Sequence, residues 1–137
     1  MIWPNGSRIR CVRNPLVFQP NCRQALRRFG STGNFLVLTI LDNVQTRAFV
    51  YRYDQGAWHA TPVPLPKNAT VSLSATSAQA GEMTFTVSNY LTPTSLWYFD
   101  AESKRLEFLK TAPAIFDASK HVVEQLKETS GDGTRIP

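Results

Sequence analysis

The 137-residue chain is 42% hydrophobic and 18% charged, which is the composition of an ordinary globular protein. Its apolar runs fall well short of the roughly 18 residues that cross a bilayer. No apolar segment follows the first arginines, as a secretory signal would require. We therefore expect no membrane partner and a cytoplasmic location, with a periplasmic one left open.

Basic residues are concentrated at the start of the chain. The formal charge is +5, and six arginines precede the first acidic residue, Asp42: Arg8, Arg10, Arg13, Arg23, Arg27 and Arg28. A basic segment can attract nucleic acid, but no recognised nucleic-acid-binding module accompanies this one. We expect no nucleic-acid partner. Residues 1–15 form a basic segment without an assigned role, in which residues 3–6 have the composition of a turn.

The two cysteines match no metal or redox pattern. Cys11 and Cys22 have ten residues between them, which is not a zinc or thioredoxin-like spacing. Two free thiols in a reducing compartment are the expected state, and a disulfide between them is the alternative.

From Phe35 onward the first half of the chain predicts antiparallel strands. Residues 24–29 fit a strand or a helical turn, and residues 30–33 fit a flexible turn. Phe35–Leu41 is apolar on both faces, as in a strand covered on both sides, and Arg47–Tyr53 is rich in strand-forming residues. Residues 58–63 fit an edge strand, because prolines such as Pro62 cannot donate to a central ladder.

The second half predicts a complete meander. Residues 70–75 and 82–88 alternate polar and apolar side chains with the period of a strand, and residues 95–99 and 105–109 supply two more strands. We predict a four-stranded antiparallel meander from Thr70 to Leu109, with Leu73, Phe85 and Val87 buried. Four strands in about forty residues are the size of one propeller blade.

The two halves repeat each other with an offset of 46–47 residues, which is within the range of propeller repeats. Leu36–Ile40 falls on Met83–Val87, and Tyr51 falls on Tyr98. We therefore predict a matching meander from about Arg23 to Val63. Only residues 119–126 fit a helix, and a strand fits them equally well. The fold class is all-β, with antiparallel four-stranded meanders that form about two propeller blades.

The C-terminal third carries a family resemblance. Residues 90–100 hold a Thr-Pro pair, an aromatic strand and an Asp-containing turn, and they resemble the last blade of prolyl oligopeptidase-like serine peptidases. Residues 115–119 are similar to the exit from that family's propeller. Residues 123–125 with 129–137 look like the first hairpin of its α/β-hydrolase domain, in which Asp132-Gly133 would be the tight turn.

This resemblance implies a seven-bladed propeller that limits entry to a hydrolase domain, which cuts short peptides after proline. It assigns residues 16–112 to a partial propeller, and residues 113–137 to a connector and first hairpin. The expected partner is an α/β-hydrolase domain, in the same protein or an adjacent chain. Because blade faces are normally covered, we also expect self-association through exposed faces. The alternative is a stand-alone basic β-sandwich or barrel that acts as an interaction module.

Catalytic signals are missing from this stretch of sequence. The chain holds no Gly-x-Ser-x-Gly nucleophile elbow, and the two histidines, His59 and His121, have no recognisable nucleophile or carboxylate partner. Trp58 and Trp97 are expected to pack in the core or between blades rather than bind a ligand.

The remaining polar positions have local explanations. The scattered aspartates fit turns rather than a metal site: Asp54, Asp100, Asp117 and Asp132. Asn68-Ala69-Thr70 fits a glycosylation sequon that matters only in a secreted eukaryotic protein. We predict no catalytic residue, no cofactor and no metal ligand, and no peptidase activity for this chain alone.

Overall fold

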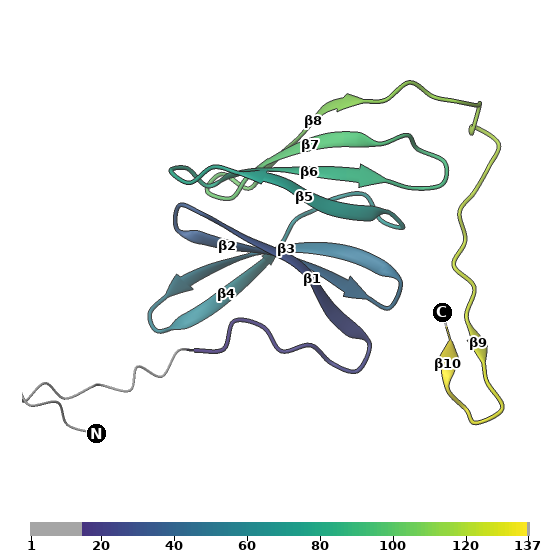
Figure 1. The fold of residues 1–137 in the computed structure, drawn as a ribbon, viewed down its shortest axis with the longest axis horizontal. Coiled ribbons are helices and arrows are strands. Elements are labelled where there is room, and N and C mark those ends of the chain that lie inside the picture. The colour runs from purple at the N-terminus through teal and green to yellow at the C-terminus, as the bar shows by residue number, and fades with distance from the viewer. Residues whose placement is uncertain (1–14, 137) are drawn as a thin grey trace, which may run out of the picture.

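The computed structural model describes residues 15–136, so the expected turn at residues 3–6 and Cys11 lie outside it. Every regular element within this range is a strand (Figure 1). The first sheet has the order β1-β2-β3-β4, formed by Gln24–Thr32, Phe35–Asp42, Gln45–Asp54 and Ala57–Pro62. The second sheet has the order β5-β6-β7-β8, formed by Thr70–Thr76, Glu82–Ser88, Ser95–Asp100 and Arg105–Thr111. A short hairpin follows, formed by β9 (Glu128–Thr129) and β10 (Arg135–Ile136).

Both predicted meanders are confirmed. All neighbouring strands within each sheet run antiparallel, and β4 is an edge strand, as its prolines require. Tight turns join β2 to β3 and β3 to β4, where Asn43 and Gln55 have φ angles of 50° and 48°. Hairpin turns of this kind need the left-handed region, which asparagine tolerates better than most residues.

The main core lies between the two sheets, which pack face to face (Figure 1). Leu73, Phe85 and Val87 are buried, as predicted, and Phe85 has no exposed surface. The first sheet contributes Phe35 and Val50, among others, to the same cluster. Alternate residues of each strand point into this interface, because successive side chains leave a strand on opposite faces.

The outer face of the first sheet, which points away from the second sheet, is also apolar. Leu38, Ile40 and Tyr51 are buried there, and Val17 and Phe18 from the preceding segment pack against them. This cover is incomplete. The pairing of β1 with β2 puts two largely exposed side chains on the same face: Leu26, which is 46% exposed, and Phe29, which is 71% exposed.

The outer face of the second sheet has the opposite character. Its cross-strand pairs carry hydroxyl groups: Thr70 with Ser88, Ser72 with Thr86, and Thr84 with Tyr98. The Tyr98 hydroxyl donates to a carboxylate oxygen of Glu82 at 2.9 Å. The two-sheet unit is therefore apolar on one outer face and polar on the other.

Strand pairing corrects one part of the sequence repeat. The predicted repeat aligns Leu36 of β2 with Met83 of β6. Leu36 pairs with Tyr51, whereas Met83 pairs with Phe99. The counterpart of Tyr51 is thus Phe99 and not Tyr98.

Three local predictions were wrong. Gly30–Thr32 continues β1 rather than forming a flexible turn, which is confined to the next two residues. Residues 119–126 form neither a helix nor a strand. The C-terminal hairpin begins at Glu128, so the earlier residues 123–125 do not belong to it. Thr32 and Gln125, within these segments, make hydrogen bonds to distant residues that are described below.

Candidate functional site

The residues considered for catalysis lie apart from one another. His59 is exposed on β4, and His121 is exposed in the segment after β8, where its ring lies 5.9 Å from that of Phe116. Trp97 packs against the core between the sheets, and Trp58 packs in the cluster on the outer face of the first sheet, which confirms their expected packing roles. Within residues 15–136, no three His, Cys, Asp or Glu side chains gather as metal ligands would.

Three of the four aspartates predicted to lie in turns accept hydrogen bonds that stabilise those turns. Asp100 accepts hydrogen bonds from the Ser103 hydroxyl at 2.6 Å and the Glu102 N–H at 3.0 Å, and these lower the pKa of its carboxyl group. The N–H groups of Ser119 and Thr134 do the same for Asp117 and Asp132. Such local hydrogen bonds stabilise the ionised form in a turn without implying chemistry.

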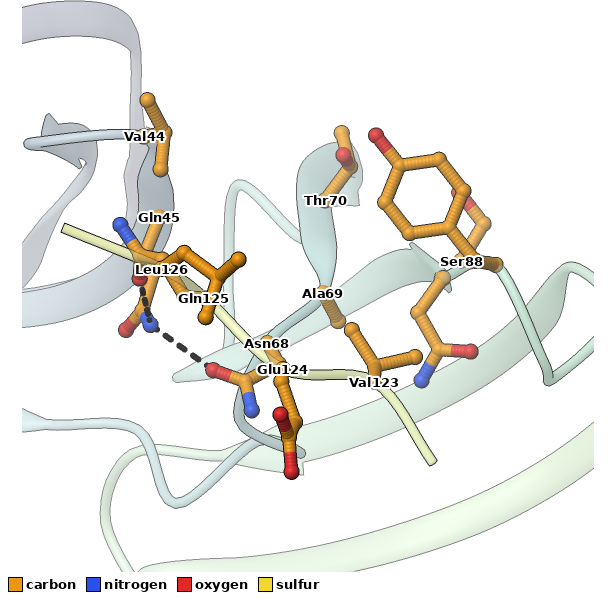
Figure 2. Close-up of a pocket in the computed structure, with 12 residues that line it drawn as sticks. Val44, Gln45, Asn68, Ala69, Thr70, Ser88, Val123, Glu124, Gln125 and Leu126 are labelled. Carbon is orange, nitrogen blue, oxygen red and sulfur yellow. Dashed lines mark hydrogen bonds between the residues drawn. The ribbon is translucent and has the colours of Figure 1, made fainter. Parts of the chain in front are cut away.

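The cavity in Figure 2, of about 520 Å³, lies where the segment between β8 and β9 crosses the ends of both sheets. It is lined by Val44 of the β2–β3 turn, by Gln45 at the start of β3, and by residues 68–70 around the start of β5. Residues 123–126 form the wall opposite these strands (Figure 2). The cavity is therefore built by segments that are far apart in the sequence.

A hydrogen-bonded set of three amide side chains holds this wall in place. The Gln45 amide donates to Asn68 Oδ1 at 2.8 Å and to Gln125 Oε1 at 2.9 Å (Figure 2). The second of these bonds ties Gln125, within residues 119–126, to the first sheet. Sequence reasoning missed Gln45 and Gln125, because nothing local marks a glutamine whose partner is 80 residues away.

The cavity has few ionisable side chains and an apolar rim. Its ionisable side chains are Glu124 and Tyr90, and it is lined by neither histidine nor cysteine. Exposed apolar side chains surround it: Val44 at 61%, Tyr90 at 87% and Leu126 at 78%.

Among residues 15–136, the structure has no helix with the length and hydropathy that a membrane span requires.

Comparison with known proteins finds a matching family and similar sequences. Residues 16–112 match the family model described as the prolyl oligopeptidase N-terminal β-propeller domain. An uncharacterized peptidase of Sinorhizobium fredii is 34% identical over 90% of this chain. A prolyl endopeptidase of Elizabethkingia miricola is 26% identical over 80% of it. The chain spans only 17% and 15% of the lengths of these two relatives.

Solved structures show the same fold. A post-proline cleaving enzyme from Rickettsia typhi matches 86% of this chain with a TM-score of 0.68 and 23% identity, over 17% of its own length. Oligopeptidase B from Trypanosoma brucei matches 87% of this chain with a TM-score of 0.72 and 16% identity, over 18% of its own length. In each of them the matched part is a small share of a much longer chain.

Proposed function

This chain belongs to the N-terminal β-propeller domain family of the prolyl oligopeptidases, and we propose that it supplies two non-catalytic, closing blades to a serine peptidase of that type. The observation that carries the proposal is the pair of four-stranded antiparallel sheets stacked face to face, over the same residues 16–112 that match the family. The match to a propeller-domain family favours blades over a self-standing sandwich.

The role of such blades is to wall a chamber and limit which substrates reach a catalytic centre. We propose that residues 113–137 lead from the blades to an α/β-hydrolase domain, in the same protein or an adjacent chain. The cavity walled by residues 123–126, with its exposed apolar rim, supports a neighbour at that end of the sheets. The complete enzyme would hydrolyse short peptides after proline.

The proposal predicts that this chain alone is inactive and that it functions inside a longer relative. The chain is produced alone, and it also replaces the matching segment of the Elizabethkingia miricola prolyl endopeptidase. A proline-containing chromogenic peptide is the substrate for both proteins. We expect turnover by the chimera and none by the isolated chain.

Two results would count against this proposal. One is turnover by the isolated chain that survives repurification and is blocked by a serine-directed inhibitor. The other is a folded chimera that does not cleave the peptide, although the unaltered endopeptidase does. A chimera that also carries Phe85→Asp is the matched control, because a charge in the core between the sheets should prevent the blades from packing.

A further inference from the structure

A small cavity of about 30 Å³ between the first sheet and the C-terminal hairpin is lined by three cationic side chains. Arg23 is the residue before β1, Lys127 is the residue before β9, and Arg135 belongs to β10. Asn43 of the β2–β3 turn and Ile136 complete the lining. The Asn43 N–H donates to the Arg23 carbonyl oxygen at 2.9 Å, so these two residues are fixed together on the sheet side.

The three cations have no acidic partner among residues 15–136. The ion pairs of this range lie elsewhere, at Arg47–Asp42, Arg52–Glu102 and Arg105–Glu107. The nearest acids in sequence are Asp42 for Arg23, Glu128 for Lys127 and Asp132 for Arg135, and none of these acids lines the cavity. Like charges brought together repel one another, so this arrangement is favourable when an anion lies between them.

The donors define the chemistry of that anion. Guanidinium groups bind carboxylates and phosphates through paired N–H donors, and a lysine ammonium adds a point charge. The Asn43 side-chain amide is a further donor. A cavity needs roughly 10–15 Å³ to hold one water molecule, so this one has room for oxygens of a single oxyanion.

We propose that Arg23, Lys127 and Arg135 form an oxyanion site that joins the first sheet to the C-terminal hairpin. The ligand is a carboxylate or a phosphate group, held by the guanidinium groups from both sides. Because all three side chains are exposed, salt screens the interaction, and we expect weak binding that is best measured at low ionic strength.

The test is a titration of the isotope-labelled chain with inorganic phosphate, followed by NMR at constant low ionic strength. We expect saturable shifts of the arginine side-chain N–H signals and of the hairpin amides. Arg135→Gln should weaken binding about tenfold, which is the loss expected for one charge-assisted hydrogen bond. Lys110→Gln is the matched control, because it removes the same charge from an exposed position on β8, and it should leave binding unchanged.

The outcomes separate clearly. Shifts that do not saturate, or equal losses in Arg135→Gln and Lys110→Gln, would overturn the site, because they indicate general screening. A parallel titration with acetate identifies the source of the anion. Saturation by acetate as well assigns the site to a polypeptide carboxylate, and saturation by phosphate alone assigns it to a phosphate group. Circular dichroism of each variant checks that the sheets remain folded.

Discussion

Thr32 provides the most specific test of how the two sheets are joined. Its side chain is 1% exposed, and its hydroxyl contacts the carbonyl oxygens of Ser77 and Ala80 in the β5–β6 loop of the other sheet. Thr32→Val keeps the shape of the side chain and removes this donor. Leaving a buried polar group without a partner costs about 1–3 kcal/mol, and we expect the free energy of unfolding to fall by that amount in urea denaturation followed by tryptophan fluorescence.

The matched control for this variant is Thr39→Val. Thr39 is equally buried, at 1%, but its hydroxyl reaches the Arg28 carbonyl oxygen within the same sheet, at 3.4 Å. This long bond should contribute less than about 1 kcal/mol. If Thr32→Val lowered the free energy of unfolding no more than Thr39→Val does, the hydroxyl contact between the sheets would not stabilise their packing.

Three further predictions follow from burial, surface character and ionisation. Phe85→Ala should lower the free energy of unfolding, measured by urea denaturation, by about 3–5 kcal/mol. Phe29→Ala should lower it by less than about 1 kcal/mol, because the Phe29 side chain is 71% exposed. Equal losses would contradict the assigned core. Phe29→Glu should reduce self-association in analytical ultracentrifugation and Thr84→Glu should not, because the apolar outer face belongs to the first sheet. A reduction by Thr84→Glu and not by Phe29→Glu would exclude the outer face of the first sheet as the contact surface. The folded-state pKa of Asp100 is lowered, so its contribution to stability is present above the unfolded pKa of 3.8 and is lost as the pH falls through the lower folded pKa. Asp100→Asn should remove this pH dependence of stability, measured by acid denaturation. An acid denaturation curve that is unchanged in the variant would count against this role of Asp100.

The sheets were predictable because their signals are local. In β5 and β6 the alternation of Val71 and Leu73, and of Phe85 and Val87, with threonine and serine fixes both the strand and its buried face. The cavity residues were not predictable, because Gln45 and its partners meet only in the folded chain.

The errors have equally physical causes. Gly30 and Thr32 look like turn residues, but a strand is favoured because Thr32 satisfies carbonyl groups of the other sheet. The predicted repeat is wrong at Tyr51 because the β6–β7 connection is one residue longer than the β2–β3 connection. Ile40 pairs with Arg47, whereas Val87 pairs with Ser95. An insertion of one residue is invisible to an overlay of two short, weakly similar segments.

The unequal outer faces of the two sheets also govern the symmetry of any assembly that this chain forms by itself. Of the two outer sheet faces, that of the first sheet is the apolar one, around Leu26 and Phe29, so two copies that associate through outer faces meet through the same patch. Such an isologous contact has twofold symmetry and is closed once two copies have joined. A head-to-tail filament would require the hydroxyl-bearing face, with Thr84 and Tyr98, to cover the apolar one, which leaves polar groups buried without partners. Association through the outer sheet faces should therefore stop at dimers.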